Sequence, residues 1–202
     1  GPTLMNEKLL GKRAIITGAG GGIGRAIAKK FASLGINVAL VARTAEKLEE
    51  TAKECEALGV KAFVYPTDLL DEQSIVRTIG RAAEDMGGID ILVNNAGIAQ
   101  SGPMVDVDAD EFDRVFATNV RAPFLMCKYA MPYLKQSDYA EIINIASVVA
   151  HKGYPWQSIY AASKHAVLGL SKSLANEVYT DDVRVHVIAP GGVYTEMVAK
   201  VR

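Results

Sequence analysis

Cysteine and histidine are scarce in this chain: its 202 residues include two of the first and three of the second. Cys55 and Cys127 do not form a CxxC motif, and so few histidines do not suit a metal cluster, so no metal site is predicted. The two cysteines are interpreted as small packing residues. This usage indicates a reduced, intracellular and cytoplasmic protein rather than a disulfide-stabilised secreted one.

Long apolar runs and clusters of one charge sign are also missing. No apolar stretch approaches the ~18 residues of a membrane span, and no run of Lys or Arg indicates nucleic-acid binding. The net charge is −1, from 22 basic and 23 acidic residues. The N-terminus lacks the apolar core of a signal peptide, and residues 1–5 are interpreted as partly a tag remnant. We expect one globular domain spanning residues 1–202.

Short β-branched runs alternate with longer amphipathic segments along the chain. Strands are predicted at 13–17, 37–42, 61–66, 89–94, 141–146 and 183–189. Helices are predicted near 23–34, 45–58, 71–86, 108–135 and 157–179. The strands are continuously apolar, as in a sheet that is covered on both faces. The pattern predicts an α/β fold: a doubly wound Rossmann-type parallel sheet with helices on both faces and ligands beyond the carboxyl ends of its strands.

A glycine-rich turn follows the first predicted strand, in the sequence AIITGAGGGIGRAIAKK. Glycines between a strand and a helix permit a tight turn and let the backbone approach a pyrophosphate, which the helix N-terminus attracts. No Gly-Lys-Ser/Thr follows, so the Walker-type phosphate loop is not matched. A turn that only packs the helix against the sheet is the alternative. A dinucleotide site is the favoured interpretation.

The spacing Thr17-Gly18-x-x-x-Gly22-x-Gly24 resembles the TGxxxGxG turn of the short-chain dehydrogenases/reductases. Further motifs follow in the family's order, each in its expected structural context: NNAG at 94–97, TNV at 118–120, INIAS at 143–147, YAASK at 160–164 and APGGVYT at 189–195. The chain therefore resembles this family along nearly its whole length. The resemblance implies hydride transfer between a nicotinamide and a carbonyl or alcohol substrate.

The same resemblance implies an active site of Asn119, Ser147, Tyr160 and Lys164. In the family the tyrosine exchanges a proton with the substrate oxygen, the serine stabilises charge on it, the asparagine supports the proton relay, and the lysine contacts the nicotinamide ribose. Tyr160 and Lys164 are four residues apart and so share one helix face. Lowering the pKa of a free phenol from about 10 to about 7 takes about 4 kcal/mol. An ammonium ~4 Å away supplies energy of that order at an effective dielectric constant of about 20.

Cofactor contacts are implied wherever the chain matches the family's binding motifs. These positions are Thr17, Gly18, Gly22, Ile23, Gly24, Arg43, Asp68, Asn95, Ala96, Gly97, Tyr160, Lys164, Pro190, Gly191, Val193 and Thr195. Asp68 resembles the family's contact to the adenine amine. It could equally cap the helix that is predicted to begin near Asp71.

Arg43 decides the predicted cofactor. It follows the second predicted strand, where an NAD-preferring site has an acid, and the residue before it is Ala42. An acid would repel a 2′-phosphate, whereas Arg43 could form a charge-assisted contact with it. NADP(H) is therefore the predicted cofactor and NAD(H) the alternative. Gly21 lacks the basic side chain that many NADP-using relatives carry in the glycine turn.

The leading interpretation is an NADP(H)-dependent carbonyl reductase or alcohol dehydrogenase with a small-molecule substrate and Tyr160 as general acid/base. One alternative is a dinucleotide-binding regulator without turnover, which would not need the Tyr–Lys pair. A second alternative is an NAD-preferring dehydrogenase of the same family. A third, an epimerase or dehydratase of the extended branch, is disfavoured by the glycine spacing and the short length of the chain. Helices 108–135 and 157–179 resemble those through which the family assembles, so a homodimer or homotetramer is expected.

The family pattern continues past the PG turn with a substrate-covering segment and a seventh strand, whereas this sequence stops at VYTEMVAKVR. A C-terminal part is therefore expected to be missing. The predicted strand 183–189 would then form an uncovered apolar edge of the sheet, which natural proteins avoid.

Overall fold

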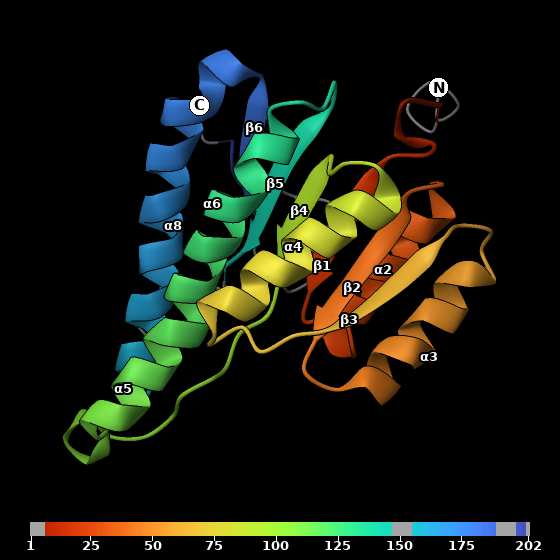
Figure 1. Ribbon diagram of the computed structural model, residues 1–202. Helices are drawn as coiled ribbons and strands as arrows, with labels where there is room; N and C mark the ends of the chain where they lie inside the picture. Colours follow the sequence, from red (N-terminus) through yellow and green to blue (C-terminus); the bar gives the residue numbers. More distant parts are fainter. Residues whose placement is uncertain (1–6, 147–154, 189–196, 201–202) are drawn as a thin grey trace.

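The computed structural model describes residues 7–146, 155–188 and 197–200 (Figure 1). One sheet runs through the described chain, with helices on both of its faces. Its strands are β1 (Arg13–Thr17), β2 (Asn37–Ala42), β3 (Ala62–Pro66), β4 (Ile91–Asn94), β5 (Ala140–Ile145), β6 (Val183–Ile188) and β7 (Met197–Lys200).

The strand order in the sheet is β3-β2-β1-β4-β5-β6-β7. Every neighbouring pair from β3 to β6 is parallel. The chain builds outward from β1 to β3, then returns to place β4 beside β1 and builds outward in the other direction. This reversal is the topological switch point, and ligands of doubly wound folds bind there, beyond the carboxyl ends of the strands. The predicted doubly wound parallel sheet is confirmed.

The expectation of an uncovered edge at 183–189 is wrong. Strand β7 pairs antiparallel with β6, with Val187 opposite Ala199. The outward backbone N–H and C=O groups of β6 therefore gain partners from the chain itself. An antiparallel neighbour suits this position because a short β7 needs no crossover helix to return beside β6.

Helices cover both faces of the sheet. One face carries α2 (Gly22–Ser33) and α3 (Ala45–Glu56), and the other carries α4 (Glu72–Met86), α6 (Ala122–Leu134) and α8 (Ser158–Val178). Ile15 of β1 belongs to the core under α4, α6 and α8, whereas Ala14 and Ile16 belong to the core under α2 and α3. Successive strand residues point to opposite faces, so a strand that is covered on both faces must be apolar throughout. None of the described helices is long and apolar enough to cross a membrane.

The predicted helix 108–135 is interrupted in the structure. It consists of α5 (Ala109–Phe116), a π-helical turn η2 (Ala117–Arg121) and α6. Pro123 has no N–H to donate to the carbonyl of Asn119, four residues earlier, so the α-helical ladder cannot continue regularly here. Such π-turns often occur at functional sites. Two short 3₁₀ turns are η1 (Met104–Asp106) and η3 (Tyr179–Asp181).

Candidate active site

The glycine turn at the end of β1 is packed so closely that two of its residues have no room for a side chain. A Cβ on Gly24 would lie 1.9 Å from the carbonyl oxygen of Gly18. Gly18 has φ +64°, and its Cβ would lie 2.8 Å from Nδ2 of Asn95. By contrast, a Cβ on Gly21 or Gly22 would meet nothing within 4 Å. The turn is therefore closely packed at Gly18 and Gly24 and open at Gly21 and Gly22.

Helix α2 begins in this turn without a side-chain cap, because Gly21 stands at the N-cap position. The first N–H groups of a helix have no partner within the helix and carry its positive dipole end. Ile23, in the same turn, is 37% exposed. An anion approaching the open side of the turn would therefore meet backbone donors rather than side chains.

The loop after β4 is joined to the glycine turn by the predicted residue Thr17. Its Oγ1 accepts hydrogen bonds from the backbone N–H groups of Asn95 and Ala96, at 2.9 and 3.0 Å. Nδ2 of Asn95 donates to the carbonyl oxygen of Gly18 at 3.3 Å. The carboxyl ends of β1 and β4 thus form one framework. Thr17 is buried and its hydroxyl is occupied by protein partners, which favours a supporting role over a direct ligand contact.

Tyr160 lies in the first turn of α8 and Lys164 one turn later, at the same edge of the sheet. The Lys164 Nζ atom is 5.7 Å from the centroid of the Tyr160 ring. Lys164 is only 7% exposed. Burial lowers the pKa of its ammonium from 10.5 to about 8, because the charged form loses hydration. A buried lysine with a perturbed pKa in a cleft is a feature of functional sites.

Asn119 is held in the π-turn η2 by both ends of its amide. Its Oδ1 accepts from the backbone N–H of Ile98 at 2.8 Å, and its Nδ2 donates to the carbonyl oxygen of Ile98 at 2.9 Å. Nδ2 also donates to Oγ of Ser163 on α8 at 3.1 Å. A Cβ on Gly97 would lie 3.2 Å from Oδ1 of Asn119 and 3.3 Å from Nζ of Lys164. The structure therefore brings Asn119, Lys164 and Gly97 together beside Tyr160.

The carboxyl ends of β2 and β3 lie at the same edge of the sheet as the glycine turn. The backbone N–H of Thr67 donates to the carbonyl oxygen of Ala42 at 2.8 Å, which places the start of the Asp68 turn beside the end of β2. Arg43 is exposed, and its side chain forms no ion pair or hydrogen bond within the described chain. A Cβ on Gly20 would lie 3.1 Å from Cβ of Lys47, so a second cationic side chain starts next to this turn.

Asp68 does not cap the following helix, which was one of its two predicted roles. Asp71 is the N-cap of α4, and its side chain accepts from the backbone N–H of Gln73. Asp68 Oδ1 instead accepts from the backbone N–H of Leu70 at 3.0 Å, within the preceding turn. The Asp68 side chain remains exposed. The contact to an adenine amine is the remaining interpretation of this residue.

Five predicted site residues lie outside the described residues: Ser147, Pro190, Gly191, Val193 and Thr195. A different set was missed by the sequence reasoning. Asn94 Nδ2 donates to Oδ1 of Asn144 at 2.9 Å, and Asn144 Nδ2 donates to Oγ of Ser171 at 2.8 Å. This buried polar chain joins β4 and β5 to α8. Its signal was present, because Asn94 ends the apolar strand β4 and Asn144 lies between two isoleucines of β5.

The residues at this edge of the sheet suit a dinucleotide better than a metal ion. The turn offers a helix N-terminus without a side-chain cap and open space at Gly21 and Gly22, while the Arg43 side chain is exposed and has no partner among the described residues. Among the residues that the structure describes, no group of three or more His, Cys, Asp or Glu side chains could hold a metal ion. The Tyr160–Lys164 pair supplies an ionisable phenol beside a buried amine, an arrangement suited to proton transfer.

Comparison with known proteins agrees with this geometry. The family model for short chain dehydrogenases matches residues 12–202. The 3-oxoacyl-[acyl-carrier-protein] reductase of Thermotoga maritima is 35% identical over 193 residues, which are 96% of this chain and 78% of the relative. The chain spans between 64% and 78% of the length of the curated relatives it matches.

Two solved structures are also similar. A metagenomic short-chain oxidoreductase in complex with NADP has a TM-score of 0.86 and 37% identity, covering 91% of this chain and 84% of that one. NAD+-bound xylitol dehydrogenase has a TM-score of 0.88 and 34% identity, covering 91% of this chain and 71% of that one. With the glycine turn, the NNAG loop and the Tyr–Lys helix at one edge of the sheet, the chain belongs to the short-chain dehydrogenase/reductase family.

Proposed function

We propose that the protein is an NADP(H)-dependent oxidoreductase that interconverts a carbonyl compound and a secondary alcohol, with Tyr160 as its general acid/base. The observation that carries this proposal is the buried Lys164 amine, 5.7 Å from the Tyr160 ring and beside Gly97 of the NNAG loop. A regulator without turnover could use Lys164 to bind the cofactor, but it would not need the Tyr160 phenol beside that amine.

Each residue of the site has a distinct task in this proposal. Tyr160 donates a proton to the substrate oxygen during reduction and accepts it during oxidation. Lys164 stabilises the negative charge on the phenol and donates to the ribose of the cofactor. Asn119 holds the Ile98 backbone, and through it the loop that follows the NNAG motif. A bound nicotinamide supplies or accepts the hydride. We assign Ser147 to the substrate oxygen by its place in the INIAS motif.

The glycine turn is assigned to the cofactor pyrophosphate. Adding a single methyl group to one of its glycines tests this assignment. Gly24→Ala should weaken NADPH binding at least about tenfold, because the new Cβ would overlap the Gly18 carbonyl and displace the turn. Gly80→Ala is the matched control, since Gly80 lies in α4, outside the turn, and its Cβ would also meet nothing within 4 Å. Fluorescence titration with NADPH measures the affinity of both variants. Equal affinities in the two variants would remove the turn from the cofactor site.

The preference for NADP(H) is assigned to Arg43, whose guanidinium has no protein partner within the described residues. A hydrogen bond to a charged group is worth about 1.5–3 kcal/mol, so kcat/KM should favour NADPH over NADH by roughly ten- to a hundredfold. The double variant Ala42→Asp, Arg43→Ala should reverse this ratio by adding repulsion and removing attraction. Lys53→Ala removes an exposed cation at the far end of α3 and should leave the ratio unchanged. A wild type that prefers NADH would overturn this assignment.

The substrate class must be identified by activity assays, because this fold occurs in enzymes with many different substrates. A panel of acetoacetyl-CoA, a 3-ketosteroid, xylulose and an aromatic ketone, each with NADPH and with NADH, covers the chemically distinct possibilities. The similar reductase and dehydrogenase named above act on an acyl-carrier thioester and on xylitol according to their names. Oxidation of NADPH with at least one carbonyl is the expected result. Tight NADPH binding without oxidation would favour the regulator instead.

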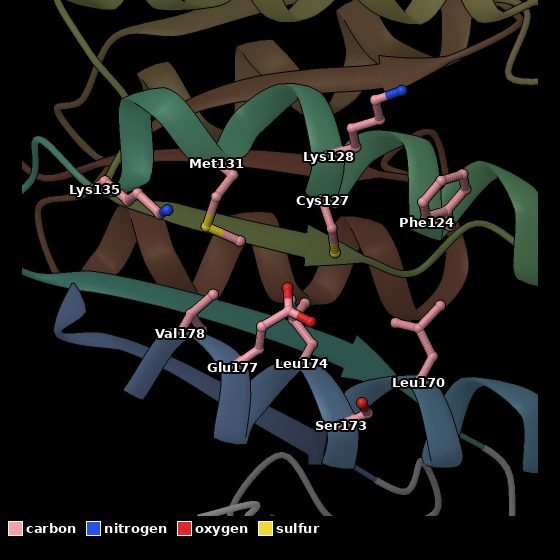
Figure 2. A pocket seen from close by; sticks show the side chains of 10 residues that line it. All are labelled: Phe124, Cys127, Lys128, Met131, Lys135, Leu170, Ser173, Leu174, Glu177 and Val178. Carbon is pink, nitrogen blue, oxygen red and sulfur yellow. The ribbon is translucent and has the colours of Figure 1, made fainter. Parts of the chain in front are cut away.

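We also propose that the protein assembles with itself through the outer faces of α6 and α8. Figure 2 shows the side chains that line a groove between these two helices. Its lining residues are Phe124, Cys127, Lys128, Met131, Lys135, Leu170, Ser173, Leu174, Glu177 and Val178. Phe124 is 46% exposed at one end of the groove, and the pair Phe112–Phe116 is stacked on the neighbouring α5. An exposed apolar strip of this kind is typical of an interface.

Acidic substitutions in the groove should dissociate the proposed oligomer. Leu170→Glu combined with Phe124→Glu should convert a dimer or tetramer to a monomer, because burying two carboxylates without partners is unfavourable. Leu58→Glu is the matched control, since Leu58 is 48% exposed in the turn after α3. Light scattering at micromolar protein concentration gives the mass of each. A monomeric wild type would contradict the proposed assembly.

A further inference from the structure

The helix that carries Tyr160 is capped by a residue from a distant loop. The N-cap residue of α8, Gln157, makes no side-chain hydrogen bond to the first turn. Instead, Oε1 of Gln100 accepts from the backbone N–H of Ile159 at 3.1 Å and from that of Tyr160 at 3.0 Å. The amide of Gln100 thereby satisfies two of the N–H groups that the helix leaves without internal partners.

The geometry fixes the orientation of this amide. Both partners are N–H donors, so the group that faces them must be the acceptor oxygen of Gln100. The side chain is 3% exposed, and its Nε2 has no hydrogen-bond partner within the described part of the chain. A buried amide group without a partner is unfavourable. An apolar side chain would avoid that cost, which indicates that the acceptor oxygen is what this position requires.

The same loop is tied to the active site at two further points. Asn119 holds both backbone groups of Ile98, two residues before Gln100. Two residues after it, the backbone N–H of Gly102 donates to the carbonyl oxygen of Trp156 at 2.7 Å. Trp156 has φ +70°, a left-handed conformation that a bulky residue rarely adopts and that its surroundings must hold. The loop from Ile98 to Gly102 therefore connects the asparagine site to the start of α8.

Because of these contacts, we propose that Gln100 is a positioning residue, which fixes the first turn of α8 and so the place of the Tyr160 phenol relative to the cofactor loop. The inference rests on the proposed function, in which Tyr160 transfers the proton. Gln100 touches neither the reacting atoms nor the cofactor in this account. Its loss should therefore lower kcat and leave the affinity for NADPH unchanged.

Three variants separate the acceptor oxygen from the rest of the side chain. Gln100→Met keeps length and volume but removes the acceptor, and kcat should fall between about 10- and 100-fold, the usual scale for a misplaced catalytic group. Gln100→Asn keeps the amide but shortens the side chain by one methylene, and the same loss is expected. Gln100→Glu keeps an oxygen at the capping position and should recover most of the lost kcat. The assay uses NADPH and the carbonyl of the panel that the wild type reduces fastest.

The matched control is Asp108→Ala. Asp108 caps α5 by accepting from the backbone N–H of Glu111 at 2.8 Å, so its loss removes a side-chain cap from a helix without catalytic residues. We expect a comparable fall in Tm for Asp108→Ala and Gln100→Met, but a fall in kcat for the second alone.

Two results would overturn the inference: wild-type kcat in Gln100→Met and Gln100→Asn, or no recovery of kcat in Gln100→Glu. The assay of Tyr160→Phe alongside keeps the inference and the proposed function apart. If Tyr160→Phe is inactive while Gln100→Met is not, only the positioning role is wrong. If Tyr160→Phe retains turnover, the proposed function itself is wrong.

Discussion

Tyr160→Phe should lower kcat by roughly 10²-fold or more, the usual contribution of a positioned acid or base. The phenol hydroxyl is the proposed proton donor, and the Phe ring keeps the packing while removing that proton. The affinity for NADPH should change little, because Lys164 and the loop around Gly97 remain in place. Steady-state kinetics and NADPH titration give the two quantities separately.

A second tyrosine provides the control. Tyr139 precedes β5 at the amino end of the strand, on the opposite edge of the sheet from the site, and its ring faces Lys12 and Arg184. Tyr139→Phe should therefore leave kcat near the wild-type value. Turnover by Tyr160→Phe equal to that of Tyr139→Phe would exclude the phenol from the mechanism.

Lys164→Met should lose both turnover and cofactor affinity, because one amine serves both in the proposed mechanism. The Met side chain fills the same buried space without a charge, so a general loss of packing is not expected. A fall in kcat of roughly 10²-fold or more matches the removal of the partner that stabilises the phenolate. Unchanged NADPH affinity would refute the ribose contact, whatever happened to the rate.

The pH dependence of cofactor binding gives an independent test of Lys164. Burial lowers the pKa of its ammonium to about 8, so the charge is present below that pH and is lost as the pH rises through it. If the ammonium donates to the cofactor, binding takes up a proton above pH 8, and wild-type affinity should fall there by up to about tenfold per pH unit. Lys164→Met should show no such fall. A wild-type affinity that is flat through this range would contradict the assignment.

The fold could be predicted because the apolar composition of its strands indicates a sheet that is covered on both faces. Strands 13–17 and 37–42 are apolar at every position between their end residues, and both were predicted with the bounds that the structure shows. The break in helix 108–135 was not predicted, although Pro123 carries the reason for it. The pairing of β7 with β6 was missed because four residues at the end of the sequence form too short a pattern to indicate a strand.

The candidate site could be proposed from the sequence where its residues are close together in the chain. Tyr160 and Lys164 are four residues apart on one helix, and the glycines of the TGxxxGxG turn are contiguous in sequence. The contacts that hold these groups are not local: Gln100 reaches Tyr160 across 60 residues, and Asn144 reaches Ser171 across 27. No periodicity indicates such pairs, because each is created only when the sheet and helices assemble. Sequence reasoning therefore proposed the Tyr160–Lys164 pair and missed the contacts that hold it.

Transfer of deuterium from NADPH labelled at C4 of its nicotinamide tests the central claim most directly. The wild-type protein is incubated with each face-specific label and the carbonyl panel, and mass spectrometry locates the label in the product. We predict one deuterium on the new carbinol carbon, delivered from one face only, with none lost to water and with the rate of label transfer lowered by roughly 10²-fold or more in Tyr160→Phe. NADPH that binds but transfers no label to any carbonyl would contradict it.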